Sequence, residues 1–421
     1  MAEKAPRHLV GGHNQSETAR FISSFKPELP SSFPASVERI ATSMVESAAK
    51  VKPGQKVLLW FDPNGLELVQ AINKKCLEKG AEVSYFMRDL DVDVEEVGQL
   101  KSNEVVGYFS QQKKLMEEAE NVIIVRAPEN PEALAQLSKA NLKAYEDAYE
   151  DVHKRRSDGT VEWSLVYWPT RYEADKEKVS YDDYFRMFIE ACDQPWDEIK
   201  AAQEILVNQL DQGKTLELFA NEKDEDPERR THVSMSIENM TFCNSTVDRN
   251  YPGSEVFSAP VMESVNGQIF AEGEYVESGH LMKNIHFKIK DGRIMEDSYA
   301  EEGNEGFQDI LRSGEGARYF GEVALGTNPG LTKRFFNALL NEKVGGSFHM
   351  AIGHCYEFDE YNGKKVKVNN GNTLKRTPIH WDVTIPMHSQ YGGGKVVLGG
   401  ETIQENGKFI DQRLSVLNPK I

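Results

Sequence analysis

The sequence lacks the patterns that mark a disulfide-stabilised, zinc-knuckle or membrane-spanning protein. Its four cysteines are widely scattered and form no CxxC pair; they are Cys76, Cys192, Cys243 and Cys355. No stretch approaches the roughly 18 consecutive apolar residues that a membrane span requires. The amino terminus has no apolar signal-peptide core. We therefore expect a protein of the reducing cytoplasm without a membrane partner.

Basic character is also scarce. The chain carries 49 Lys and Arg residues against 67 Asp and Glu residues, which gives a formal net charge of −18. Phosphate binding needs a basic stripe, so we expect no nucleic-acid partner. Neither GxxxxGK nor GxGxxG occurs, which leaves nucleotide binding without support. An acidic field of this kind attracts cationic ligands such as the protonated amino terminus of a peptide.

The length of 421 residues exceeds what one compact core usually holds, so two domains are expected. Residues 1–34 are polar and rich in Ser and Pro, and we expect an extended lead-in there. Residues 35–212 alternate helical spacing with short apolar runs such as Lys56–Phe61 and Asn121–Arg126. This alternation predicts an α/β domain with a mostly parallel sheet.

The composition changes after Gly213. Residues 213–421 alternate apolar and polar positions, with tight-turn signals at Asp291-Gly292 and Asn406-Gly407. One strongly helical pattern, residues 331–344, interrupts this half. The second half is therefore predicted to be a mainly β (α+β) domain.

The triplet His380-Trp381-Asp382 is the most informative pattern in the chain. On a β-strand, residues two apart point to one face, so an imidazole and a carboxylate would stand side by side. This pairing suits a borderline divalent cation such as zinc. His349, in another segment, supplies a second imidazole, and Tyr356 follows it seven residues later.

Three glutamates stand at the ends of small apolar runs or helices. Glu255 follows the Pro252-Gly253 turn, Glu322 lies in residues 321–326, and Glu342 lies near the end of the predicted helix. A lone glutamate in such a place is normally a surface carboxylate. Three of them, together with two histidines and an aspartate, supply the carboxylate-rich set that a paired-metal hydrolase needs.

These segments resemble the aminopeptidase T family of cocatalytic metallopeptidases, which also includes bacterial aminopeptidase S enzymes. The matching segments occur in the family's order and are residues 250–260, 321–326, 340–343, 349–353 and 380–382. Weaker similarity near residues 51–59 and 163–170 extends the resemblance over nearly the whole chain beyond residue 35.

The resemblance implies a metal-binding catalytic domain with two divalent ions per chain, of zinc, cobalt, manganese or magnesium. The ligands that it implies are Glu255, Glu322, Glu342, His349, His380 and Asp382. It implies further that Glu322 bridges the two ions and that Tyr356 donates to the oxyanion of the tetrahedral intermediate. The expected activity is removal of amino-terminal residues from short peptides with a free amino terminus, with a lean towards apolar residues such as Leu. A homodimer is expected as well.

The sequence departs from the family pattern in three places. Ser254 replaces the usual Gly before the first Glu, and an insertion with a basic cluster occupies roughly residues 362–376. Residues 221–230 are charged where the family has a more regular strand. Lys375 and Thr377 stand where the family has Asn and Ser. None of these changes removes an expected ligand, but they leave substrate preference and the orientation of His380 open.

Two rival functions remain open from the sequence. A mononuclear iron ring-opening dioxygenase needs two histidines and one carboxylate, which His349, His380 and Asp382 provide. A non-catalytic peptide-binding relative is the other rival. The adjacent pair His354-Cys355 suggests a thiol nucleophile, but neighbours on an extended chain point to opposite faces.

Overall fold

The chain folds into two compact units. The computed structural model describes residues 6–26, 33–157 and 159–421. The first unit comprises Met1–Asp193 and Val247–Pro252, and the second comprises Gln194–Thr246 and Gly253–Ile421. Each unit has its own hydrophobic core.

A parallel sheet forms the centre of the first unit. Within the described residues its strand order is β2-β1-β3-β4-β8, and every neighbouring pair is parallel. The strands are β1 (Lys56–Phe61), β2 (Glu82–Met87), β3 (Asn121–Arg126), β4 (Glu162–Tyr167) and β8 (Asn250–Tyr251). The helices are α1 (Gln15–Ser24), α2 (Pro34–Ser43), α3 (Leu66–Glu78), α4 (Leu90–Gly98), α5 (Val105–Tyr108), α6 (Ser110–Glu118), α7 (Lys139–Ser157), α8 (Arg171–Lys176) and α9 (Tyr181–Cys192). The predicted α/β fold with a parallel sheet is confirmed.

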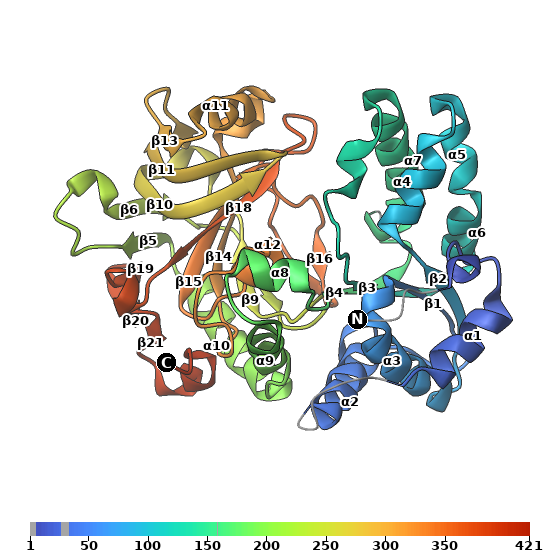
Figure 1. Cartoon of the computed structure of the whole chain (residues 1–421). Helices are drawn as coiled ribbons and strands as arrows, with labels where there is room; N and C mark the ends of the chain where they lie inside the picture. The colour runs from blue at the N-terminus through green and yellow to red at the C-terminus, as the bar shows by residue number, and fades with distance from the viewer. Residues whose placement is uncertain (1–5, 27–32, 158) are drawn as a thin grey trace. The chain divides into compact units, whose positions relative to one another are not determined.

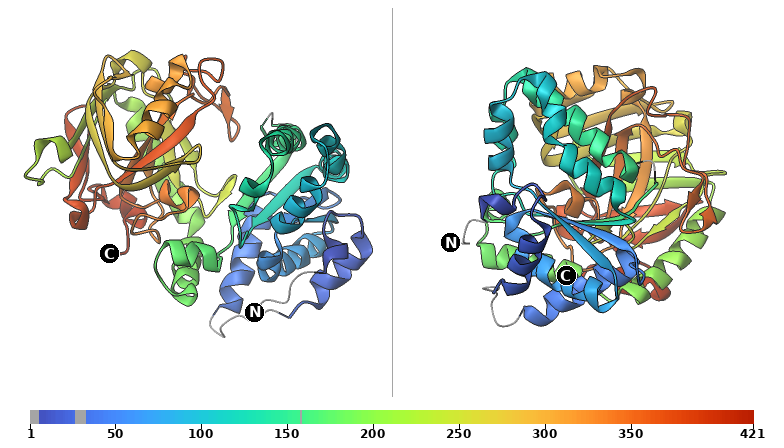
Figure 2. Two further views of the ribbon diagram at one scale, coloured as in Figure 1. Left: turned by 45° about the horizontal axis from the view of Figure 1, so that its top comes forward. Right: turned by 90° about the vertical axis from the view of Figure 1, so that its right-hand side faces the viewer.

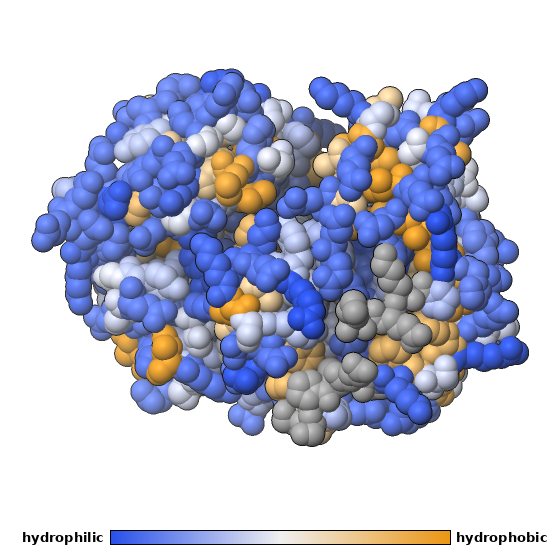
Figure 3. Space-filling model, viewed as in Figure 1, coloured by the Kyte–Doolittle hydropathy of each residue, from blue (hydrophilic) through white to orange (hydrophobic). Residues whose placement is uncertain are grey.

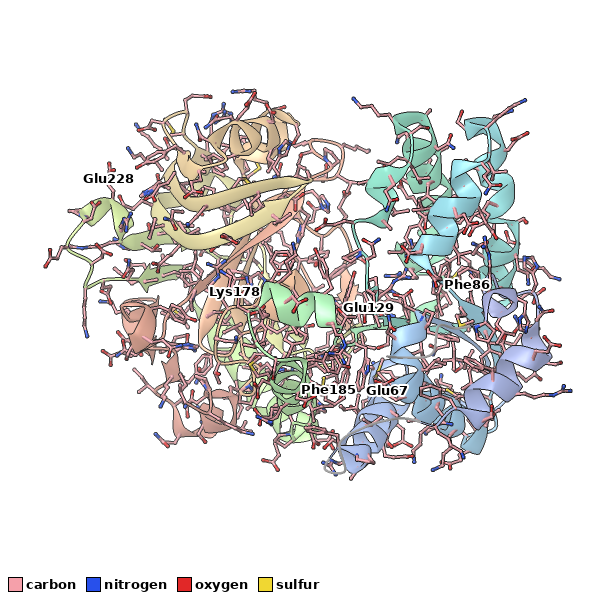
Figure 4. All side chains as sticks on the ribbon, viewed as in Figure 1. Glu67, Phe86, Glu129, Lys178, Phe185 and Glu228 are labelled. Carbon is pink, nitrogen blue, oxygen red and sulfur yellow. The ribbon has the colours of Figure 1, made fainter. Side chains whose placement is uncertain are left out.

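Helices cover both faces of this sheet, which explains why its strands read as continuous apolar runs. Figure 1 places α1, α2 and α3 on one side of the sheet and α4 to α7 on the other, and Figure 2 gives two further views. On the α4–α7 side, Leu58 and Trp60 pack into a core with Phe109 and Tyr145. Phe86, labelled in Figure 4, meets Trp60 edge to face with ring centroids 4.5 Å apart.

Two antiparallel sheets form the second unit, as the period-2 pattern predicted. One has the order β12-β11-β10-β6-β5-β19-β20-β21, with β13 beside β11, and the other has the order β18-β15-β14-β9-β7. The first is built from β5 (Thr215–Ala220), β6 (Thr231–Ser236), β10 (Asn266–Glu277), β11 (His280–Lys290), β12 (Arg293–Ile294), β13 (Tyr299–Glu302), β19 (Gly394–Leu398), β20 (Glu401–Glu405) and β21 (Lys408–Phe409). The second is built from β7 (Cys243–Ser245), β9 (Glu255–Ser258), β14 (Phe320–Gly326), β15 (Ser347–Gly353) and β18 (His380–Pro386). Helices α10 (Trp196–Gln212), α11 (Asn304–Arg312) and α12 (Ala338–Asn341) and the hairpin of β16 (Glu360–Tyr361) and β17 (Lys364–Lys365) complete it.

Both predicted tight turns are present. Asp291-Gly292 joins β11 to β12 and Asn406-Gly407 joins β20 to β21. All four of these residues have positive φ, as a two-residue hairpin turn of this kind requires.

The boundaries differ from the sequence expectation. Helix α10 lies in the second unit, although the boundary was expected near residue 212. Its apolar residues, including Ile199, Leu206 and Leu210, pack into the core of the second unit. The helix therefore belongs to that unit because of these packing contacts, although its composition resembles that of the first unit. The expected extended lead-in contains helix α1 within its described residues.

The predicted helix over residues 331–344 is wrong. Only α12 is helical there, because tertiary contacts override the helical propensity of the preceding segment. The Asn337 side chain accepts from the Leu339 backbone N–H and so begins the helix late. Upstream, the Arg334 guanidinium donates to the backbone carbonyls of Glu272 and Glu274, which holds that residue outside a helix.

The surface is mainly hydrophilic over the face drawn in Figure 3, in keeping with a charged content of 28%. None of the helices in the described part of the chain has the length and apolar character that a bilayer crossing requires.

We expect Phe348→Ala to destabilise the second unit strongly. Phe348 is fully buried on β15 between the two sheets, and removing such a ring costs about 3–5 kcal/mol of unfolding free energy. Urea unfolding monitored by circular dichroism checks this. The control Leu281→Ala, at a side chain that is 58% exposed, should change stability by less than about 0.5 kcal/mol. Equal effects of the two substitutions would contradict the packing described here.

Candidate metal centre

Most of the expected ligands lie on one face of the five-stranded sheet. Glu322 on β14 is opposite Ala351 on β15, which is opposite Asp382 on β18. Residues that face each other across strands, or lie two apart along one strand, share a face of the sheet. His349 and His380 therefore join Glu322 and Asp382 on that face.

The other face of the same strands is apolar. Its side chains pack into the core of the second unit and include Val323, Leu325, Phe348, Met350, Ile352, Trp381 and Val383. On the ligand face, the small side chains of Ala324 and Ala351 stand between the polar ones. Side chains alternate between the two faces along each strand. Because the apolar residues are buried on one face, the residues between them must point to the ligand face.

Two further carboxylates come from outside these three strands. Glu255 begins β9 and is opposite Gly326 on β14. Glu342 directly follows α12, in a segment tied back to the sheet by the hydrogen bond from the Asn328 N–H to the Lys343 carbonyl. All six expected ligands are therefore brought together, although they come from five separate segments.

The six side chains form two groups of three. One group contains Glu255, Glu342 and His349, and in each group the ligand-type atoms lie within 4.8 Å of one another. The other contains Glu322, His380 and Asp382. This grouping is the arrangement expected of a site for two cations.

Glu322 links the two groups. Its Oε1 lies 3.3 Å from His349 Nε2, and its Oε2 lies 3.3 Å from His380 Nε2. His349 Nε2 is also 3.4 Å from Glu255 Oε2. One carboxylate thus spans both imidazoles.

Several of the ligand-type atoms are buried without a hydrogen-bond partner in the described part of the chain. They are Glu255 Oε2, His349 Nδ1, His380 Nε2 and Asp382 Oδ1. A buried polar atom without a partner costs about 1–3 kcal/mol, so such atoms are kept where something else satisfies them. Carboxylate oxygens and imidazole nitrogens are the donors that zinc, cobalt, manganese and magnesium accept. The residues present therefore fit divalent cations.

The electrostatics of the group also favour positive charge. Burial opposes ionisation of Glu322, but the facing His349 and His380 lower its pKa to about 2. Burial likewise opposes charge on His349 and His380, yet the surrounding carboxylates raise the pKa of these imidazoles to about 9 and about 10. Burial raises the pKa of Glu342 to about 8 despite its contact with Lys343. Protons on His349, His380 and Glu342 thus offset the negative charge of the carboxylates, as a bound cation would.

Lys343 is a site residue that the sequence analysis missed. Its ammonium lies 2.5 Å from Glu255 Oε1 and 3.0 Å from Glu342 Oε1, and its side chain is only 4% exposed. Burial lowers the pKa of this ammonium, but the two carboxylates outweigh burial and raise it. The only available signal was its position directly after an expected ligand.

The backbone after β15 orients His380. The His380 Nδ1–H donates to the His354 carbonyl at 2.6 Å, which leaves Nε2 free to face the carboxylates. Gly353 makes this geometry possible: its φ is +104°, and a Cβ there would lie 1.9 Å from the Ile379 carbonyl oxygen. The buried Asn372 donates to the Gly353 carbonyl at 2.5 Å. The insertion at residues 362–376 therefore braces the turn beside His380.

Tyr356 and its neighbours lie against His380. The Tyr356 ring centroid is 5.2 Å from that of His380, and 38% of the residue's surface is exposed. Burial of the phenol and the nearby carboxylates, first Glu322 and Asp382, raise the pKa of Tyr356 well above 10. Burial also raises the pKa of the Cys355 thiol, which disfavours the thiolate that a nucleophile needs.

Ser254, at the position where the family resemblance has Gly, precedes β9 directly. Its φ is +106°, a conformation that favours glycine. Its hydroxyl compensates through hydrogen bonds with Thr327 Oγ1 at 2.8 Å and Gln203 Nε2 at 3.2 Å. These contacts hold the backbone from which Glu255 projects.

Comparison with known proteins decides the family. The model of the thermophilic metalloprotease family (M29) matches residues 33–409. The chain belongs to the M29 family. Among M29-like relatives, aminopeptidase AmpS of Bacillus subtilis is 29% identical over 141 residues, which are 32% of this chain and 34% of that protein. Aminopeptidase T of Thermus aquaticus is 37% identical over 113 residues, which are 25% of this chain and 26% of that protein.

A solved structure supports the fold of this M29 chain. The wild-type AmpT structure from Thermus thermophilus matches with a TM-score of 0.70 at 19% identity, over 90% of this chain and 100% of that one. By contrast, the sequence matches to the two relatives above span only 34% and 26% of their own lengths. The family model and the solved structure thus show the family and the fold.

We expect Gly353→Ala to disturb the site more than the matched substitution Gly363→Ala. Both glycines have positive φ, but a Cβ at Gly363 meets no atom within 4 Å. Gly363→Ala therefore adds only the conformational cost of about 1–2 kcal/mol. Gly353→Ala adds a backbone clash beside His380. Thermal unfolding of both variants tests this, and a smaller loss for Gly353→Ala would contradict the close approach.

Proposed function

We propose that this M29 chain is a metal-dependent aminopeptidase that removes amino-terminal residues from short peptides. The observation that carries the proposal is the convergence of six ligand-type side chains in two groups of three, some of whose buried atoms have no hydrogen-bond partner among the described residues. The names of the relatives AmpS and aminopeptidase T support the same activity. The proposed ligands are Glu255, Glu322, Glu342, His349, His380 and Asp382.

Divalent ions held by these side chains would polarise the scissile carbonyl and lower the pKa of a water molecule towards neutrality. The chain's own residues contribute position and proton transfer. Glu322, which faces both imidazoles, is placed to accept a proton from the attacking water and to return it to the leaving amine. Another acid of the second unit, Glu315, is less suited to that role because it is ion-paired with Arg376 at 3.0 Å.

Tyr356 is proposed to stabilise the oxyanion. Its raised pKa keeps the hydroxyl protonated near neutral pH, so it donates a hydrogen bond rather than repelling the developing charge. The residue as a whole is 38% exposed, which leaves part of it accessible to a substrate.

The acidic character of the site suits the positively charged amino terminus of a peptide. A carboxylate anchoring that ammonium would restrict cleavage to the first residue. We further propose a preference for apolar residues such as Leu, a homodimer, and a place in the reducing cytoplasm. The last is supported by the four cysteines, which are buried and form no disulfide in the described part of the chain.

A dioxygenase is less well supported. A mononuclear iron site uses two histidines and one carboxylate, whereas Glu255, Glu322 and Glu342 all lie at this site as well. Membership in a metalloprotease family points the same way.

Metal-stripped protein reloaded with zinc, cobalt or manganese should release Leu from Leu-containing dipeptides and short peptides. The expected release stops when the amino terminus is acetylated, because the ammonium is then absent. Amino-acid release measured by chromatography is the assay. If no metal restores cleavage, the peptidase proposal fails, and iron-loaded protein in an oxygen electrode becomes the next assay.

Glu322→Gln should abolish peptide turnover while the protein remains folded. The amide preserves the shape of the side chain but cannot carry the proton. Steady-state kinetics, with circular dichroism as the folding control, test this. Retained turnover would remove Glu322 from the mechanism.

Tyr356→Phe should lower kcat roughly 10²- to 10³-fold, the usual effect of removing one oxyanion donor, with a smaller change in KM. The packing partners of the ring are retained because only the hydroxyl is lost. Phe358→Leu, at a neighbouring ring whose centroid lies 5.3 Å away, serves as the control and should leave kcat within a few-fold of the parent. An unchanged kcat in Tyr356→Phe would exclude the proposed donor.

A further inference from the structure

Lys343 gives one of the two ligand groups a cation of its own. Its ammonium contacts Glu255 Oε1 and Glu342 Oε1, the two carboxylates of the group that also contains His349. The side chain is 4% exposed, so water screens this contact little. A buried lysine between two carboxylates is a strong electrostatic feature that the proposed chemistry does not use.

The second group differs in this respect. The ion pairs of Glu322 and Asp382 are with the imidazoles His349 and His380. An imidazole nitrogen can itself bind a metal, whereas an ammonium group has no lone pair and cannot be a ligand. The second group therefore offers an incoming ion two carboxylates without a lysine between them, whereas the two carboxylates of the first group share the Lys343 ammonium.

The loop around Lys343 holds this ammonium in place. Its backbone carbonyl accepts from the Asn328 N–H at 3.0 Å, and the Asn328 side chain donates to the Gly253 carbonyl at 3.0 Å. Gly253 lies two residues before Glu255, so the segment that carries the lysine is tied to the segment that carries its partner. These contacts hold the backbone from which the Lys343 side chain projects, and the two ion pairs with Glu255 and Glu342 hold its ammonium.

The first group nevertheless retains atoms for an ion. Lys343 contacts one oxygen of each carboxylate. The other oxygen of Glu255, Oε2, lies 3.4 Å from His349 Nε2 and has no hydrogen-bond partner among the described residues. An ion that enters this group therefore finds ligands, but it must do so beside a fixed positive charge.

We propose that Lys343 makes the two metal positions unequal. The group of Glu322, His380 and Asp382 fills first, and the group of Glu255, Glu342 and His349 takes its ion at a concentration at least tenfold higher because of the Lys343 ammonium. This inference rests on the proposed metal centre, and it assigns Lys343 the role of a positioning residue that sets metal occupancy.

Calorimetric titration of metal-stripped protein with zinc or cobalt tests the inference. The expected result for the parent protein is one tight and one weak binding event. Lys343→Met keeps most of the length of the side chain but removes the charge, and it should tighten the weak event at least tenfold while leaving the tight event unchanged. Ion counts after gel filtration give a second readout that does not depend on activity: one ion retained by the parent and two by Lys343→Met.

Two control variants make the result specific. Lys343→Arg keeps the charge and should keep the difference between the two events. Lys290→Met removes a positive charge from an exposed position on β11 and should change neither event. If Lys343→Met does not fold, ligand variants of the parent decide instead: Asp382→Asn should remove the tight event, and Glu342→Gln should remove the weak one.

The outcomes separate this inference from the function on which it rests. Two equal events in the parent protein, or an unchanged or weakened second event in Lys343→Met, would overturn the role of Lys343 while leaving the metal centre intact. The opposite assignment of the two ligand variants would also overturn it. Absence of binding in the parent and in Lys343→Met would overturn both the metal centre and the inference.

Discussion

The structure of the second unit depends on a concentration of buried carboxylates that its own cationic groups balance only in part. The buried Glu255 and Glu322 are gathered with the half-buried Glu342 and Asp382, where a charge without a partner is costly. Lys343 offsets one of these charges, and the raised pKa values of two imidazoles allow protons to offset others. A protein tolerates such a cluster when a cation completes it, which is why the site favours a metal-dependent reaction.

The same strands serve the core and the site. In β14, β15 and β18 the residues on one face fill the apolar core and those on the other carry the ligand-type groups. The core therefore fixes the register, and the register fixes the spacing of the ligands, because a slip by one residue would exchange the two faces. The side chain of Phe348 points into the core, on the face of the sheet opposite the ligand-type groups. Residues of this kind thus contribute to the geometry of the site because they fix the register.

Much of this organisation could be predicted from the sequence. The apolar runs identified the parallel strands, and the spacing of His380 and Asp382 placed both on one face of a strand. Sequence periodicity could not predict where the side chains of Glu342 and Lys343 lie. Both residues belong to an irregular segment whose shape depends on contacts with distant parts of the second unit. The helix predicted over residues 331–344 was wrong for that reason. The boundary near residue 212 differed because α10 packs by tertiary contact and not by composition.

Lys343 illustrates why adjacency in sequence does not define a role. Two neighbouring residues, Glu342 and Lys343, follow the end of α12, where the chain is neither helix nor strand and neighbours need not point apart. Both side chains therefore enter the same charged cluster, one as a proposed ligand and the other as a fixed ammonium. A lysine at this place supports folding of the ion-free chain, since it forms ion pairs with the buried Glu255 and the half-buried Glu342. The same charge opposes the ion that the site is built to hold. The Lys343 side chain thus stabilises the metal-free protein and lowers the affinity of its group for a metal ion. The group of Glu322, His380 and Asp382 contains no lysine and is expected to attract the first ion more strongly.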